Sequence, residues 1–479
     1  MQPPTLIEGY DRCGLRAEQL GAPEFRTAHG CRYAYIAGAM FSGIAGVTML
    51  ERLAGRGLLG FFGSGGLSLQ ELEAALAALT TKLSRERPWG CNLLHNLYEP
   101  ELEERTVDLL LRYQVRRISA SAYTRLTLPL VRYRVTGLQR TPGGEVNPRH
   151  QLLAKLSRPE LAEQFLAPPP AKLLSKLFED EAITREEYEL AQNLPMADAI
   201  TVEADSGGHT DKGVSTVLLP EIQRLRDRAR ERHHYSPRVH IGAAGGLGTP
   251  MAVAAMFYLG ADYVLTGSVN HCTVEAATSE PVKDLLERMS PVDVTMAPAP
   301  DLFELGAKVQ VLRRGVLYPG QANKLYELYR TYQRWEDLPL VEREKLEAKV
   351  FRRPFVELLT ETLSYWDQRK PELAEKARAE SHLALALVFR WYLGKSSRWA
   401  INGDPERKQD YQIHTGPALG AFNSWVEGTP YQSWRARHVD EVAELLMQGA
   451  AVHAAARGGR EGGGFRGSGP GEPRPLARV

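Results

Sequence analysis

Two glycine-rich stretches, each placed after a predicted strand, are the part of this sequence best suited to bind an anion. AAGGLG at 243–248 follows an apolar run over 239–243, and TGS at 266–268 follows a run over 263–266. Glycines let backbone N–H groups close around a phosphate, and the helix start predicted at Thr249-Pro250 favours negative charge. The residues predicted to bind a phosphate are Gly245, Gly246, Gly267 and Ser268. The alternative is a pair of tight turns that bind nothing.

A histidine preceded by two glycines is the best candidate for proton transfer. The segment EADSGGHTD begins at Glu203, at the end of an apolar run over 199–203, and places Gly207 and Gly208 directly before His209. The glycines allow the backbone to pass close to a flat ligand, and an imidazole suits proton transfer near neutral pH. His209 is therefore the predicted catalytic residue. The alternative is a surface histidine in a flexible loop.

Polar side chains in other apolar runs are candidates for contact with a flat cofactor such as a flavin. Lys155 interrupts the run 152–156, and Asn92 lies near the end of the run 89–94. A lysine there could sit against the electron-rich edge of a reduced flavin, or it could reach out to water. The Asn92 amide can donate and accept hydrogen bonds, or it could be a turn residue. The small residues before and at Ala39-Met40 would let a ring lie against backbone.

The alternation of strands and helices predicts the scaffold. Eight apolar or β-rich runs alternate with helical patterns, at 33–36, 58–62, 89–94, 117–121, 152–156, 199–203, 239–243 and 263–266. Such alternation favours a parallel sheet covered by helices, and about 250 residues is typical of a closed barrel. We predict an α/β fold, a (β/α)8 TIM barrel with an added helical substrate-binding lobe. An open doubly wound sheet is the competing architecture.

The expected domain boundaries follow from the same pattern. An N-terminal extension covers 1–29, the barrel covers 30–290 with a helical insertion at about 166–192, and a helical lobe, in which no convincing strand repeat is found, covers 291–456. The last residues, 457–479, are rich in Gly, Arg and Pro, and we predict them to be disordered.

Composition narrows the class of protein. The chain has 479 residues, of which 43% are hydrophobic and 24% charged, as in globular proteins. The formal net charge is only +1, so the net charge does not indicate binding to nucleic acid. No apolar run is long enough to span a bilayer and no secretory signal is evident, so a cytoplasmic protein without membrane contact is expected. The four cysteines form no Cys-x-x-Cys pair, and no metal site is expected. No Gly-x-Gly-x-x-Gly follows the first predicted strand, so the Rossmann dinucleotide fingerprint is missing there, and no P-loop occurs.

Together these motifs resemble a known family. EADSGGHTD, AAGGLGTP and LTGSVN resemble the nitronate monooxygenase-like flavin barrels. More narrowly, SASAYTRLTLPLVRYRVTGL, KVQVLRRGVLYPGQANKLYELY and DYQIHTGPALGAFNSW resemble the trans-acting enoyl reductases of polyketide and polyunsaturated fatty-acid synthases. The resemblance covers about residues 30–453 and includes the helical region.

The resemblance implies the cofactors, the substrate and the partner. It implies FMN as prosthetic group, NADPH or NADH as hydride donor, and a 2,3-enoyl thioester on an acyl carrier protein as substrate. By analogy, Gly245, Gly246, Gly267 and Ser268 would hold the FMN phosphate, and His209 would face the substrate. The residues expected around the ring or ribityl chain, or elsewhere in the cofactor site, are Ala39, Met40, Asn92, Lys155, Glu203, Gly207 and Gly208.

Two other functions remain open from the sequence. One is nitronate oxidation with His209 as base, and the other is a flavin-binding scaffold without activity. The helical region favours the enoyl reductase, because a carrier-bound acyl chain needs an entry groove and a docking face. Arg313, Arg314 and Lys324 are candidates for that face, or an ordinary solvated surface. The sequence does not determine the oligomeric state.

Overall fold

The structure is a computed structural model that describes the whole chain except residues 1–4, 85, 96–98, 236–237, 459–472 and 477–479. The chain divides into two compact units. The first contains residues 1–206, 211–277 and 421–479, and the second contains residues 207–210 and 278–420. The units are described separately.

The first unit is a closed barrel of eight parallel strands. Around the barrel the strand order is β1-β11-β10-β8-β7-β4-β3-β2. The barrel strands are β1 (Tyr35–Ala37), β2 (Leu59–Phe62), β3 (Trp89–Leu94), β4 (Arg117–Ser121), β7 (Gln151–Leu156), β8 (Ala199–Glu203), β10 (His240–Ala244) and β11 (Val264–Thr266). They match the eight predicted runs to within about two residues at each end, so the predicted TIM barrel is confirmed and the open sheet is excluded.

The strand register brings the carboxyl ends of the strands to one rim. Asn92 lies opposite Ser119 of β4, Lys155 lies opposite Thr201 of β8, and Ala244 lies opposite Glu203. In barrels of this kind the loops at that rim carry the functional groups.

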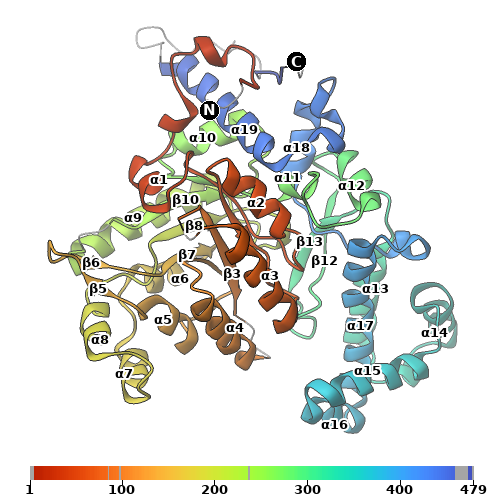
Figure 1. Cartoon of the computed structure of the whole chain (residues 1–479). Helices are drawn as coiled ribbons and strands as arrows, with labels where there is room; N and C mark the ends of the chain where they lie inside the picture. Colours follow the sequence, from red (N-terminus) through yellow and green to blue (C-terminus); the bar gives the residue numbers. More distant parts are fainter. Residues whose placement is uncertain (1–4, 85, 96–98, 236–237, 459–472, 477–479) are drawn as a thin grey trace. The chain divides into compact units, whose positions relative to one another are not determined.

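Helices surround the barrel, and several begin where local sequence signals predict (Figure 1). Ser68 and Glu71 form a capping box at the start of α3, and Thr249 accepts a hydrogen bond from the Ala252 N–H at the start of α10. The helices that follow the first seven barrel strands are α2 (Val47–Gly55), α3 (Leu69–Lys82), α4 (Pro100–Arg112), α5 (Leu128–Val135), α6 (Pro159–Leu166), α9 (Ser215–His233) and α10 (Pro250–Tyr258).

The last helix of the barrel unit comes from the end of the chain. Only α11 (Ser268–His271) directly follows β11, whereas α19 (Val439–Gly458) contacts α10, α2 and β1. The second unit is therefore inserted between the last barrel strand and the helix that covers it. This differs from the expected lobe of 291–456, because residues 421–458 belong with the barrel.

Residues before β1 cover the amino-terminal end of the barrel. The Phe25 ring of α1 (Pro23–His29) stacks on Tyr263 at 4.2 Å and joins the barrel core. His29 is fully buried there, and burial, aided by the positive charges of Arg117 and His240, lowers its pKa to about 3.

The two ends of the described chain pair with each other. Ile7 forms an antiparallel bridge with Pro475, and the Leu476 N–H donates to the Leu6 carbonyl at 2.8 Å. Residues 473–476 therefore have partners, and 457–458 end α19, so disorder was wrongly expected there. The rest of the predicted disordered tail lies outside the described residues.

Two insertions precede β7 and β8. A hairpin of β5 (Gln139–Arg140) and β6 (Val146–Asn147), which was not predicted, lies before β7. Before β8, α7 (Ala171–Glu179) and α8 (Arg185–Ala191) form the expected helical insertion, with Thr184 and Glu187 as a capping box.

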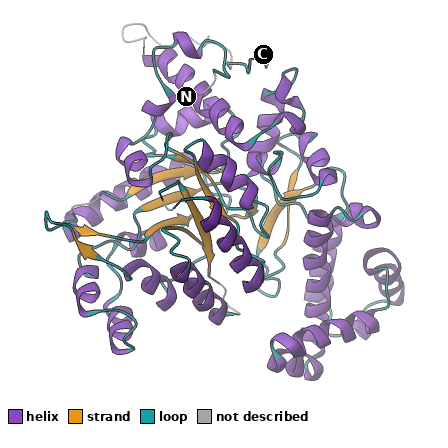
Figure 2. Ribbon diagram, in the orientation of Figure 1, coloured by secondary structure: helices purple, strands orange, loops and turns teal. Residues whose placement is uncertain are grey.

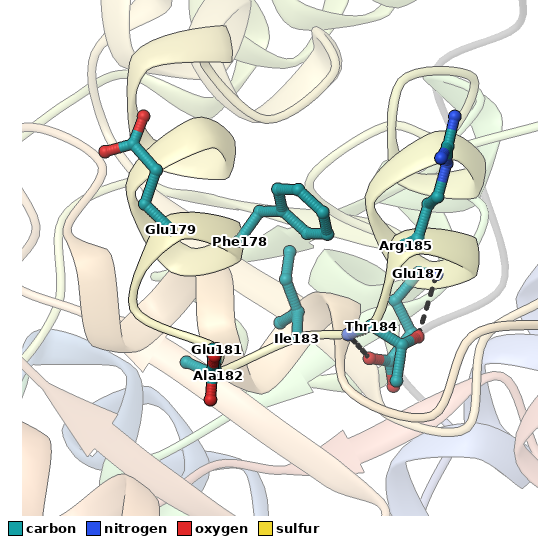
Figure 3. A pocket seen from close by; sticks show the side chains of 8 residues that line it. All are labelled: Phe178, Glu179, Glu181, Ala182, Ile183, Thr184, Arg185 and Glu187. Carbon is teal, nitrogen blue, oxygen red and sulfur yellow. Dashed lines mark hydrogen bonds between the residues drawn. The ribbon is translucent and has the colours of Figure 1, made fainter.

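A shallow hollow lies between α7 and α8 (Figure 3). It is lined by Phe178, Glu179, Glu181, Ala182, Ile183, Thr184, Arg185 and Glu187. The Glu187 carboxylate accepts hydrogen bonds from the N–H groups of Thr184 and Gly137, so it serves as a cap. The hollow contains no predicted site residue, and we assign it no function.

The second unit combines a small sheet with helices (Figure 2). Its antiparallel sheet has the order β12-β13-β9, from β12 (Val294–Pro298), β13 (Lys308–Leu312) and β9 (Gly208–His209). The helices are α12 (Glu280–Glu287), α13 (Tyr318–Thr331), α14 (Leu340–Lys345), the π-helix η4 (Leu346–Phe351), α15 (Phe355–Arg369), α16 (Pro371–Ala379) and α17 (Ser381–Asn402). The sequence showed no convincing strand repeat in this region, because short strands with few turn signals leave little periodicity.

A core rich in aromatic residues holds the second unit together. Trp335 stacks on Phe355 at 4.2 Å, and Phe351 packs near Phe389 and Tyr392.

Among the described helices of the chain, none has the length and apolar character needed to cross a bilayer. The helix α18 (Pro417–Trp425) spans the boundary between the units.

Candidate functional site

The loop after β10 has the geometry of an anion-binding turn. Gly245 and Gly246 have φ values of 92° and 72°, in the left-handed region that favours glycine. A Cβ on Gly245 would lie 2.7 Å from the Ala204 carbonyl carbon, whereas a Cβ on Gly246 would meet nothing within 4 Å. The N–H groups of Gly245, Gly246 and Leu247 donate no hydrogen bond within the described part of the chain. The loop therefore presents unpaired donors beside open space, which suits a phosphate.

The loop after β11 adjoins the first, because β11 pairs with β10. A Cβ on Gly267 would also meet nothing within 4 Å, and Ser268 is half-buried. The Thr266 hydroxyl is instead turned into the protein, where it pairs with the Tyr35 hydroxyl and the Asn270 amide. Of this motif, Gly267 and Ser268 thus remain as candidate ligands.

The Asn92 side chain is fixed as a hydrogen-bond acceptor. Its Nδ2 donates to the Ser119 carbonyl at 2.7 Å and to Ser121 Oγ at 3.2 Å. Its Oδ1 accepts no bond from any described residue. Asn92 is 7% exposed, so the oxygen is available to a donor of a bound ligand, such as a ring N–H or a hydroxyl group.

The Lys155 side chain forms an ion pair and is only partly exposed to water. Its Nζ lies 2.5 Å from Glu203 Oε1 on the neighbouring strand, and Ser206 Oγ donates to the same oxygen at 2.9 Å. The Lys155 and Glu203 side chains are 28% and 14% exposed. The two predicted residues therefore form one half-buried ion pair, which leaves no isolated charge beneath a ligand.

The loops after β1 and β2 touch through their backbones. A Cβ on Gly63 would lie 1.6 Å from the Met40 carbonyl oxygen, so glycine is required there. The Gly43 N–H donates to the Gly63 carbonyl at 2.9 Å. This contact fixes the half-buried residues Ala39 and Met40 at the carboxyl end of β1.

His209 belongs to the second unit, although it follows β8 by only a few residues. It lies in β9, and its Nε2 is 3.0 Å from Asp301 Oδ1. Asp301 was not predicted, because it is 92 residues away in the sequence and no local pattern marks it.

A buried polar network at the ends of β3 and β4 was also missed. Glu103 accepts hydrogen bonds from His95 Nδ1 at 2.8 Å, from the Tyr123 hydroxyl at 2.9 Å and from the Thr127 hydroxyl. Glu103 is 3% exposed, and three donors satisfy its carboxylate. The segment LHNLYEPELE carries two of the residues, but nothing in it reveals their contact.

Comparison with solved structures decides the family. The chain matches the crystal structure of the enoyl reductase domain of MlnA, from the macrolactin biosynthesis cluster of Bacillus amyloliquefaciens, with 39% identity and a TM-score of 0.88. The match covers 92% of this chain and 99% of that domain. The chain belongs to this enoyl reductase family. The resemblance drawn from the motifs is confirmed.

Curated relatives agree with membership of the enoyl reductase family. The chain is 48% identical over 441 residues to the polyketide biosynthesis protein PksE of Bacillus subtilis, and 42% identical over 414 residues to a polyunsaturated fatty acid synthase polypeptide of Thraustochytrium. It spans 57% of the length of PksE and 28% of the synthase polypeptide, while the matches cover 92% and 86% of this chain. Residues 332–411 also match the family of the (acyl-carrier-protein) S-malonyltransferase inserted helical domain.

More distant structures share the fold alone. FabK from Thermotoga maritima is 17% identical with a TM-score of 0.53, and the match covers 89% of this chain and 94% of FabK. A nitroalkane oxidase from Streptomyces ansochromogenes is 15% identical with a TM-score of 0.51. Both share the barrel fold predicted from the sequence.

Within this chain, most predicted cofactor residues meet at one rim. Five consecutive barrel strands, β1, β11, β10, β8 and β7, carry all of them except Asn92 on β3 and the two glycines of the second unit. Gly207, Gly208 and His209 lie in the second unit. Their predicted roles, like those of the rim residues, remain predictions.

Proposed function

We propose that this chain reduces the 2,3-double bond of enoyl thioesters on an acyl carrier protein, using NADPH or NADH through bound FMN. The observation that carries the proposal is the match to the MlnA enoyl reductase domain over 99% of that domain, which includes both the barrel and the second unit. The synthases named among the relatives, for polyketides and polyunsaturated fatty acids, support carrier-bound substrates.

The rim residues fit an FMN molecule. The unpaired N–H groups at 245–247, with Gly267 and Ser268, offer donors to a phosphate, and the Asn92 oxygen offers an acceptor. A bound FMN would accept hydride from the nicotinamide and deliver it to the β-carbon of the enoyl group. We infer FMN and not FAD, because no Gly-x-Gly-x-x-Gly follows the first barrel strand, where a dinucleotide fingerprint would lie.

The chain's own residues have two tasks in this reaction. The rim binds and orients the cofactor, and its bonded side chains, including the Lys155–Glu203 pair, do so without rearrangement. His209 supplies a proton to the α-carbon, or positions the thioester while water supplies it. The Asp301 contact restrains the His209 ring in either case.

Nitronate oxidation is the competing activity, because it also needs a flavin barrel and a histidine that acts as base. The nitroalkane oxidase likeness supports the shared fold and no more. A flavin-binding scaffold without activity is the third candidate.

One comparison separates the three. Turnover of a crotonyl carrier thioester with NADPH is measured beside oxygen consumption with a propyl nitronate. We expect NADPH-dependent reduction of the thioester and little nitronate turnover. Faster nitronate oxidation with no thioester reduction would overturn the proposal, and a flavinated protein inactive in both assays would favour the scaffold.

The cofactor is tested separately. The purified protein should be yellow, and acid should release FMN. Recovery of FAD, or a colourless protein that does not take up FMN, would contradict the assignment.

A further inference from the structure

The backbone that carries His209 is built into the sheet of the second unit. In β9, Gly208 lies opposite Gln310 and His209 lies opposite Val309 of β13. A Cβ on Gly207 would lie 2.7 Å from the Thr415 carbonyl carbon, and Gly208 has a φ of 78°. These contacts hold the segment in a conformation that only glycines allow.

The turn that carries Asp301 is also fixed. It connects β12 to β13, and the Ala299 N–H donates to the Ala307 carbonyl at 2.9 Å across it. Arg390 Nε donates to the Pro300 carbonyl at 3.0 Å on one side of Asp301. On the other side Phe303 is fully buried. The Asp301 carboxylate is therefore presented by a turn anchored at both flanks.

The two side chains meet with a defined polarity. His209 Nε2 lies 3.0 Å from Asp301 Oδ1, and an ionised carboxylate only accepts hydrogen bonds, so Nε2 carries the proton. Partial desolvation by the surrounding chain raises the pKa of Asp301, but the hydrogen bond from His209 and the charges of His209 and His414 outweigh it, and the net pKa lies below the usual value. The carboxylate is therefore ionised, and by linkage it favours the protonated imidazole.

We propose that Asp301 is a positioning residue for His209. Its carboxylate orients the imidazole and keeps it protonated for transfer to the substrate. The inference rests on the proposed function for the statement that His209 acts on a substrate. It goes further in stating that Asp301 and β13, both in the second unit, prepare this histidine.

The exposure of the pair separates this role from a structural one. The His209 and Asp301 side chains are 50% and 61% exposed, and ion pairs that solvent screens contribute little to folding stability. Loss of the Asp301 carboxylate should therefore alter the orientation and protonation of the His209 imidazole and slow enoyl reduction, while the fold is retained.

The test uses Asp301→Asn, which keeps the size of the side chain and removes its charge. Asp301→Glu is the conservative variant, and Asp367→Asn, which breaks an exposed ion pair with Arg378 in the same unit, is the matched control. In the chain without cofactor, nuclear magnetic resonance follows the His209 imidazole as pH is varied. In Asp301→Asn we expect its titration midpoint to move to lower pH, and in the control we expect no change.

Rates in the loaded enzyme complete the test. In Asp301→Asn, reduction of bound FMN by NADPH should stay within twofold, and enoyl reduction should slow by about tenfold, a part of the 10²–10⁴ that a general acid contributes. The pH profile of enoyl reduction should shift to lower pH, and Asp301→Glu should recover part of the rate. An unchanged His209 titration, equal slowing of both steps, or an unchanged enoyl rate would overturn the inference. A wild-type chain that reduces no enoyl thioester would refute the proposed function instead, and the titration would still test the contact.

Discussion

A single substitution at Gly246 tests whether the loop after β10 binds a phosphate. Gly246 is exposed, its φ is 72°, and a side chain there would project into open space. Asp and Asn have nearly the same shape and both tolerate the left-handed region, so their effects on the backbone should cancel. Gly246→Asp and Gly246→Asn therefore differ mainly by one negative charge.

The size of the effect follows from Coulomb's law. A carboxylate about 4 Å from one phosphate charge is repelled by about 1 kcal/mol in water and by about 4 kcal/mol at an effective dielectric constant of 20. Because Gly246 is exposed, we expect about 2 kcal/mol, which corresponds to roughly thirtyfold weaker FMN binding in Gly246→Asp than in Gly246→Asn.

Flavin fluorescence titration of both variants, with FMN and with riboflavin, measures this difference. Riboflavin lacks the phosphate, so both variants should bind it equally. Circular dichroism and thermal unfolding check that both variants fold alike. Equal FMN affinities of the two variants, or the same thirtyfold loss for riboflavin, would refute a phosphate site at this loop.

Three further substitutions test other parts of the structure. His209→Ala should keep FMN and its reduction by NADPH and should slow enoyl reduction by about 10²–10⁴-fold in stopped-flow experiments, and a rate within a factor of two of wild type would remove His209 from catalysis. The pKa of the buried His29 is lowered to about 3, so the side chain stays neutral in the folded chain, whereas in the unfolded chain it binds a proton below about pH 6.5. The contribution of His29 to the free energy of unfolding is therefore fully present above about pH 6.5 and falls by about 3 kcal/mol by pH 4. Denaturant titrations should show a flatter pH dependence for His29→Asn, and an identical slope would contradict the assignment. Glu103→Ala leaves three donors without their acceptor and should lower the free energy of unfolding by about 2–4 kcal/mol, whereas a loss below about 0.5 kcal/mol would show that the network is dispensable.

The sequence by itself determined the barrel and its rim. Each parallel strand is buried on both faces, so it appears as a short apolar run, and the glycines after the last two strands lie beside each other once the barrel closes. Capping residues such as Ser68 and Thr249 act over three or four residues, and local sequence is enough to locate them. The motifs that identify the family are also short runs of neighbouring residues, so the sequence was sufficient to recognise them.

Tertiary structure alone decided the partners of the polar residues. The sequence predicts that Lys155 contacts a flavin or reaches water, and it does not reveal the ion-pair partner, Glu203, 48 residues away on the next strand. Asp301 meets His209, and Glu103 collects His95 and Tyr123, only because strand pairing and helix packing bring distant segments together. Hydrogen bonds between side chains leave no periodicity in a sequence, since one contact fixes one pair. Tertiary structure also decided that residues 421–458 belong with the barrel, because the apolar face against which a helix packs is set by the folded chain and not by the local sequence of the helix.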